Sequence, residues 1–150
     1  MVHSYISCYV HYIFSTKDRE HLITPLFKER LWAYIGGIAR DNRMKALAVG
    51  GTSNHVHALI SLPSTLSIAK GIQLLKGGSS KWVHDEFPAH RFFSWQEGYG
   101  AFSIGISRVE ETITYIKTQE EHHRLVTFEE EYRAFLRANE IEYDEKYIWD

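Results

Sequence analysis

Hydrophobic and polar positions follow two different periods along this chain, and their order predicts a mixed α+β protein. Four segments rich in β-branched and aromatic residues are predicted to be strands, at residues 4–16, 44–50, 54–60 and 91–106. Four segments with apolar residues at helical spacing are predicted to be helices, at residues 25–43, 67–84, 108–123 and 127–139. The last strand segment contains glycines and could instead be a hairpin.

The order of these elements is β-α-β-β-α-β-α-α, and its first six members match the split βαβ arrangement of ferredoxin-like folds. We therefore expect an antiparallel four-stranded sheet with helices on one face, followed by C-terminal helices. The 54–60 strand would be central in that sheet. A chain of 150 residues is predicted to form a single domain, residues 1–150.

Several residues mark where the helices begin or are interrupted. Ser67 is a candidate N-cap, and Thr127 with Glu130 has the spacing of a capping box. The pair Gly77-Gly78 lies inside the 67–84 segment, where two glycines cost a helix about 2 kcal/mol. Either the helix kinks there, or the backbone is bare so that another group can approach.

Composition places the chain among ordinary soluble proteins, with 44% hydrophobic and 24% charged residues. No apolar run approaches the roughly 20 residues that a membrane helix needs. The N-terminus has no basic region followed by an apolar one, so no secretory signal is expected. One cysteine, Cys8, cannot form an internal disulfide. These observations favour a cytoplasmic protein without a membrane partner.

The formal net charge of −2 conceals an uneven distribution. Residues 1–108 carry 12 lysines and arginines against 7 acidic residues, whereas residues 109–150 carry 5 against 12. A basic body is compatible with a phosphate-binding face, although an acidic surface helix alone would give the same imbalance. Within the body, the segment 76–81 combines Lys76 and Lys81 with glycines and serines, which suits phosphate contacts or a merely solvated helix face.

The motif His55-Val56-His57 lies on the predicted central strand. Side chains alternate along a strand, so both imidazoles face the same side. Neutral ring nitrogens bind divalent metals, which makes the pair a candidate metal site. The alternative is a pair of buried histidines that are satisfied by hydrogen bonds. His122 and His123 end the 108–123 helix, where an imidazolium is favourable, and we assign them that role.

The His55-Val56-His57 strand, together with Tyr115-Ile116-Lys117-Thr118-Gln119 after the fourth strand, resembles the HUH single-tyrosine transposases of insertion-sequence 200-like (IS200/IS605) elements. The resemblance extends over nearly the whole chain and includes residues 95–103 and the ending from 121 to 147. It implies that His55 and His57 bind the metal, that Gln119 is the third protein ligand, and that Tyr115 is the nucleophile. The implied cofactor is Mg²⁺ or Mn²⁺.

These residue types suit the cleavage and rejoining of a phosphodiester bond. Attack of the Tyr115 oxygen on phosphorus gives a covalent 5′-phosphotyrosine and a free 3′-hydroxyl, and the retained phosphodiester can be rejoined later. A metal ion would polarise the phosphate and orient it. A free tyrosine titrates near pH 10, so some group must accept its proton, and the sequence does not identify that group.

The resemblance also implies the partners: single-stranded DNA with hairpins near the element ends, and a second copy in a homodimer in which Tyr115 could act in trans. Our candidates for DNA-phosphate contacts are Lys17, Arg19, Lys76 and Lys81. Two other functions remain open. One is an inactive or domesticated DNA-hairpin-binding module of the same fold, and the other is a metal hydrolase that uses water instead of tyrosine.

Overall fold

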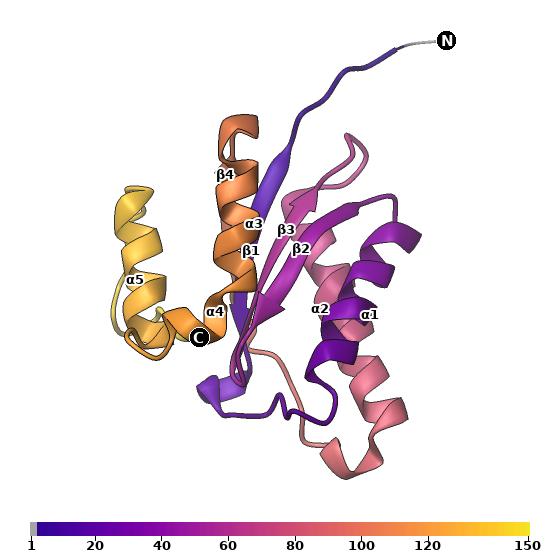
Figure 1. Cartoon of the computed structure of the whole chain (residues 1–150), viewed down its shortest axis with the longest axis vertical. Coiled ribbons are helices and arrows are strands. Elements are labelled where there is room, and N and C mark those ends of the chain that lie inside the picture. Colours follow the sequence, from indigo (N-terminus) through magenta and orange to yellow (C-terminus); the bar gives the residue numbers. More distant parts are fainter. Residues whose placement is uncertain (1–2) are drawn as a thin grey trace.

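The computed structural model describes residues 3–150 and contains one four-stranded antiparallel sheet with helices against both faces (Figure 1). Its strands are β1 (Tyr9–Ser15), β2 (Lys45–Gly51), β3 (His55–Ser61) and β4 (Gly100–Ile104). Their spatial order is β2-β3-β1-β4, so β3 is an inner strand, as predicted. This order, with helices α1 (Lys28–Asp41) and α2 (Ile68–Glu86) inserted as expected, confirms the α+β split βαβ arrangement.

Helices α1 and α2 cover one face of the sheet and enclose the main hydrophobic core (Figure 1). Alternate residues of β1 point into this core, namely Val10, Tyr12 and Phe14. Leu31 from α1 and Leu75 from α2 meet them and are fully buried. Because removing apolar surface from water is the main favourable contribution to folding, this layer provides the rigid support for the other face.

The opposite face of the sheet carries α3 (Val109–Lys117), α4 (Gln119–His122) and α5 (Phe128–Ala138) (Figure 1). Helix α3 packs on β2 and β3 through Val109 and Ile116. Helix α5 forms a separate cluster with β1 and β4, and Trp149 of the C-terminal tail packs against it. The residues that β3 and β1 direct to this face are therefore enclosed by the C-terminal helices.

Two predicted strands are shorter in the structure than in the sequence pattern. Strand β1 begins at Tyr9 instead of residue 4. Its neighbours β3 and β4 end at Ser61 and Ile104, which pair with Tyr9, so earlier residues have no strand to pair with. The predicted strand at 91–106 is reduced to β4. Upstream of β4 the chain is irregular, apart from an isolated bridge between Trp95 and Thr16.

Helices α1 and α2 agree closely with the prediction, and Ser67 caps α2 by accepting a hydrogen bond from the backbone N–H of Lys70 at 3.0 Å. Helix α2 continues without interruption through Gly77-Gly78. A Cβ at Gly78 would lie 2.8 Å from Cδ1 of Ile38 in α1, so the bare backbone serves helix packing. Within residues 3–150, no helix combines the length and the apolar character needed to cross a bilayer.

The predicted 108–123 helix is divided at Thr118, which separates α3 from α4. The backbone of Thr118 has φ −107° and ψ 23°, outside the helical region. The chain therefore changes direction between Tyr115 and Gln119. Thr127 is confirmed as the N-cap of α5, since its side chain accepts a hydrogen bond from the backbone N–H of Glu130 at 3.1 Å. The Glu130 carboxylate accepts from the Thr127 hydroxyl at 3.0 Å and not from its backbone N–H, so the capping box is formed in part.

Candidate active site

The paired histidines lie on β3 and point to the face that the C-terminal helices cover. His55 and His57 are both fully buried, with 0% of their surface exposed. The turn before them requires glycine at Gly51, whose φ is 153° and whose Cβ would lie 2.1 Å from the carbonyl oxygen of His55. At Gly50 a Cβ would lie 2.6 Å from the backbone oxygen of Ile116, so glycine also lets α3 approach the strand pair.

The ring of His55 is oriented by the turn that precedes it. Its Nδ1 lies 2.8 Å from Oδ1 of Asn54 and 3.0 Å from Oγ1 of Thr52. Its Nε2 faces the interior, 2.9 Å from Oε1 of Gln119. Both ring nitrogens thus face an amide oxygen, which can only accept, and the tautomer with its proton on Nδ1, donated to Asn54, is the one that leaves the Nε2 lone pair for a metal ion.

The ring of His57 is held from the neighbouring strand by another histidine. Nε2 of His11, on β1, lies 2.8 Å from Nδ1 of His57, and both rings are buried. On its other side, Nε2 of His57 lies 2.9 Å from Oε1 of Glu131. His57 is therefore fixed at both nitrogens, with Nε2 directed towards α5.

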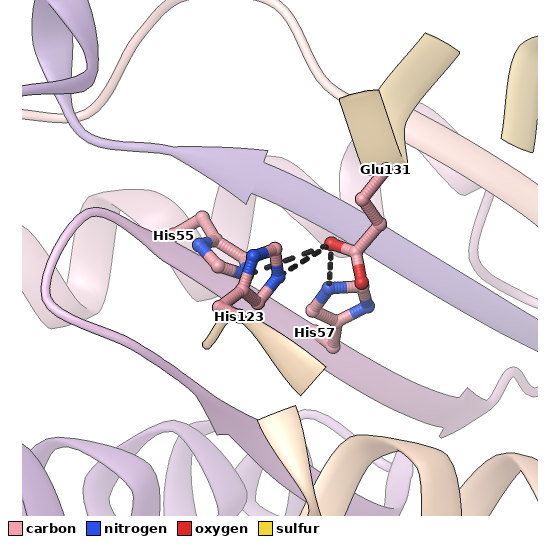
Figure 2. A group of neighbouring side chains, drawn as sticks. All are labelled: His55, His57, His123 and Glu131. Atoms are coloured by element: carbon pink, nitrogen blue, oxygen red, sulfur yellow. Dashed lines mark hydrogen bonds and ion pairs between the residues drawn. The ribbon is translucent and has the colours of Figure 1, made fainter. Parts of the chain in front are cut away.

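Glu131 is the centre of the arrangement, and Figure 2 shows its carboxylate pointing from α5 towards the ring nitrogens of three histidines. In addition to the His57 contact, its Oε1 lies 3.1 Å from Nε2 of His123 and 3.6 Å from Nε2 of His55. The Glu131 side chain is only 2% exposed. Four groups from β3, the α4 end and α5 thus converge on one enclosed point.

Burial and charge together set the protonation states here. Burial, followed by the neighbouring His57, lowers the pKa of His11 to about 3 and that of His55 to about 3. Burial alone would raise the pKa of Glu131, but hydrogen bonds from His123 and His57 outweigh it and hold that pKa well below its ordinary value. At neutral pH His55 is therefore an unprotonated imidazole and Glu131 a carboxylate, the forms that bind metals, whereas for His123 burial would lower the pKa but the hydrogen bond and charge of Glu131 raise it overall.

This donor set fits a divalent metal ion. One ligand atom from each of His55, His57, His123 and Glu131 lies within 4.8 Å of all the others. Oε1 of Gln119 lies 3.0 Å from Nε2 of His123, so the amide adjoins the same group. Mixed nitrogen and oxygen donors suit first-row transition metals, and the carboxylate and amide oxygens also suit harder cations.

Tyr115 reaches this cluster from α3 with its hydroxyl group. The hydroxyl donates a hydrogen bond to Oε2 of Glu131 and lies 3.2 Å from Nε2 of His122. Gln119 donates to the same Oε2 from its Nε2 at 3.1 Å. Burial and then the Glu131 charge raise the pKa of Tyr115, so the resting hydroxyl keeps its proton at neutral pH.

The comparisons with known proteins agree with this arrangement. The family model described as "Transposase IS200 like" matches residues 4–119, more than half of the chain. The chain belongs to the IS200-like transposase family. Relatives in that family include the transposases for insertion sequence element IS200 of Salmonella typhimurium and Salmonella typhi. Each is 22% identical over 130 residues, which cover 83% of this chain and 85% of the relative.

Two solved structures share the fold of this IS200-like transposase. A Deinococcus radiodurans protein assigned as a transposase has a TM-score of 0.62 at 21% identity, covering 79% of this chain and 96% of its own. A REP-associated tyrosine transposase bound to a REP hairpin has a TM-score of 0.59 at 18% identity, covering 84% and 74%. Membership of the IS200-like family supports a DNA-cleaving enzyme, and the buried histidine–glutamate cluster is where a metal could bind.

The four cations that the sequence suggested for DNA contacts lie in different surroundings. Lys17 is exposed, and Lys81 is exposed and paired with Asp85, with Nζ 2.6 Å from Oδ2. Arg19 is partly buried, and its Nε lies 3.1 Å from Oε1 of Glu129. Lys76 donates to backbone carbonyl groups, including that of residue 97 at 3.0 Å, and burial lowers its pKa to about 8.

Four residues of this IS200-like site were missed by the sequence analysis. His122 and His123 were assigned to the end of a helix, but the ring of His122 contacts Tyr115 and that of His123 turns into the cluster. His11 lies on the strand next to β3, and period-two alternation could have placed it on the same face. Glu131 could have been found as a carboxylate inside an apolar stripe, three residues after Phe128 and four before Phe135.

Proposed function

We propose that this IS200-like transposase cleaves and rejoins single-stranded DNA through a covalent 5′-phosphotyrosine on Tyr115. One observation carries the proposal. The Tyr115 hydroxyl donates to Glu131, whose other oxygen contacts His57 and His123, so the nucleophile adjoins the candidate metal ligands within one chain. A phenol that only filled space on an amphipathic helix would not need these partners.

In the proposed reaction, the Tyr115 oxygen forms a bond to phosphorus as the bond from phosphorus to the 3′ oxygen breaks. The leaving 3′ oxygen takes up a proton and becomes a hydroxyl, and the phenolic proton passes to an acceptor. Glu131 and His122 are the two groups that the hydroxyl contacts. Rejoining reverses these changes with a new 3′-hydroxyl as attacking group.

We propose His55, His57 and Gln119 as metal ligands, joined by Glu131 and His123, and Mg²⁺ or Mn²⁺ as the ion. When bound, the ion would supply Lewis-acid stabilisation of phosphoryl charge. The protein residues prepare this site in its absence. Asn54 and His11 orient the two strand histidines, and burial lowers the pKa of His55 so that its ring is neutral.

We further propose hairpin-containing single-stranded DNA as substrate and a homodimer as the assembly. The hairpin bound to the REP-associated relative supports the choice of substrate. Lys17, Arg19, Lys76 and Lys81 remain our proposed phosphate contacts. Of these, Lys76 has the strongest contacts within the protein, because its ammonium group donates hydrogen bonds to backbone carbonyl oxygens.

The test is covalent trapping. The full chain is incubated with Mn²⁺ and a 3′-labelled hairpin oligonucleotide with single-stranded flanks, so that the label stays on the fragment joined to Tyr115, and products are separated under denaturing conditions. We expect a protein–DNA adduct with the unchanged chain and with Tyr147→Phe, a control at a tyrosine that is 57% exposed, and no adduct with Tyr115→Phe. Cleavage that survives in Tyr115→Phe would instead favour the water-using hydrolase. Binding without cleavage would favour the inactive module.

A further inference from the structure

A cleft of about 600 Å³ opens beside the histidine cluster, between the β2–β3 turn and a wall made by α4 and α5. Two of its lining residues belong to the candidate active site. His123 contacts Glu131, and Asn54 orients His55. The cleft therefore leads from the surface to the cluster, with room for a nucleotide-sized group.

Two cations line this cleft, and each is paired with a glutamate of the opposite wall. Arg19, from the 3₁₀ turn η1 (Lys17–Arg19), has its Nε 3.1 Å from Oε1 of Glu129 on α5. Lys28, at the start of α1, pairs with Glu120 on α4. The two ion pairs thus connect the basic body to the acidic C-terminal part across the cleft.

Arg19 is held there against its backbone preference. Its φ is 56° and that of Asp18 is 55°, a left-handed conformation that is unfavourable for a non-glycine residue. Its guanidinium also lies 4.5 Å from the ring centroid of Trp149. A residue that is locally unfavourable but fixed by its surroundings is typical of functional positions.

We propose that this cleft binds the backbone of single-stranded DNA next to the cleaved bond, with Arg19 and Lys28 contacting phosphates in place of Glu129 and Glu120. The inference rests on the proposed function and adds Lys28 as a contact residue. Partly exposed ion pairs contribute little to the stability of the fold, whereas a phosphate contact also releases a counterion from the DNA. Exchange of a glutamate for a phosphate is therefore favourable, and the two glutamates act as internal competitors of DNA.

The experiment measures equilibrium binding of a fluorescent single-stranded oligonucleotide with a hairpin, by anisotropy over a series of NaCl concentrations in EDTA. We expect Glu120→Gln and Glu129→Gln each to tighten binding about three-fold or more, an effect that misfolding would not produce. Lys28→Gln and Arg19→Asn should weaken it and reduce the slope of log K against log salt by about 0.7 per lost contact. Asparagine is chosen at residue 19 because it tolerates the left-handed conformation.

The matched controls are Glu111→Gln and Arg108→Gln, which break an exposed ion pair at the start of α3, with Nη2 2.7 Å from Oε1. They produce the same charge changes, so they measure the general electrostatic effect. If the cleft variants change affinity and salt slope no more than these controls do, the cleft proposal is wrong while the proposed function stands. If the unchanged chain binds no single-stranded hairpin DNA, both proposals fail together.

Discussion

At the scale of single residues, Glu131 is the group on which the site depends. Its two oxygens contact His57 and His123 on one side and Tyr115 and Gln119 on the other. One carboxylate thus links the candidate metal ligands to the candidate nucleophile. The shared carboxylate holds the metal ligands and the nucleophile in fixed positions relative to one another.

We predict that Glu131→Gln weakens Mn²⁺ binding by at least about ten-fold, because an anionic oxygen donor is replaced by a neutral amide. Isothermal titration calorimetry on the metal-free chain measures this. The control is Glu130→Gln, one residue away and exposed, where glutamine can still accept the hydrogen bond from the Thr127 hydroxyl. Equal affinities in the two variants would remove Glu131 from the ligand set.

Buried histidines also predict how stability depends on pH. The folded pKa values of His11 and His55 are about 3, below the ordinary value of 6.5, so the unfolded chain binds protons that the folded chain does not. Their contribution is fully present above pH 6.5 and is lost as the pH falls towards 3. Within that window, each of the two histidines lowers the free energy of unfolding by about 1.4 kcal/mol for every pH unit of acidification.

Urea unfolding of the metal-free chain in EDTA, from pH 6.5 to 5, tests this prediction. His11→Gln retains a hydrogen-bonding side chain but cannot titrate, so the slope of unfolding free energy against pH should fall by the contribution of one group. His3→Gln, the same substitution at an exposed position, is the matched control. A slope that is the same in both variants would show that His11 is not buried in its neutral form.

How much of the site the sequence could predict also depends on single residues. Alternation along β3 was enough to pair His55 with His57, because strand geometry is local. The sequence marks Glu131 as a carboxylate in an apolar stripe, but it does not show that Glu131 and His123 meet the strand histidines, because this depends on how α4 and α5 turn back onto the sheet. That turn begins with the break at Thr118, which the periodicity of the 108–123 segment did not reveal.

At the scale of elements, Gly77 and Gly78 give a matched pair in α2. A Cβ at Gly77 meets nothing within 4 Å, whereas one at Gly78 lies 2.8 Å from Cδ1 of Ile38. We predict that Gly77→Ala stabilises the protein by about 0.5–1 kcal/mol through helix propensity. Gly78→Ala gains the same propensity but crowds α1, so it should be less stable than Gly77→Ala by about 1–3 kcal/mol.

Urea unfolding of both variants at pH 7 gives the comparison. Equal stabilities would mean that Ile38 moves aside without cost and that the glycine pair has no packing role.

The helices and strands also show which elements the sequence pattern predicts well. Helices α1 and α2 were predicted closely because their apolar stripes and the Ser67 cap of α2 are local features. Strands β1 and β4 were overestimated because strand length depends on the partner's length.

At the scale of the whole molecule, the charge imbalance has a structural counterpart. The acidic C-terminal part folds over the basic body, and Glu120 and Glu129 pair with cations of that body. The same part supplies Tyr115, Gln119 and Glu131 to the sheet histidines. The basic and acidic parts of the chain therefore form one site together, and the contacts of Tyr115 and Gln119 with Glu131 and the histidines are made within a single chain.

This completeness leads to a prediction for the proposed homodimer. In mixed dimers of His57→Ala with Tyr115→Phe, a site built within one chain lacks either its histidine or its nucleophile in both subunits. We therefore expect no adduct from doubly tagged, purified mixed dimers. If Tyr115 acted in trans, one intact site would form from the unaltered histidine of one subunit and the unaltered tyrosine of the other. Adduct formation at about half the wild-type level would then show that the Tyr115–Glu131 contact is exchanged between subunits during the reaction.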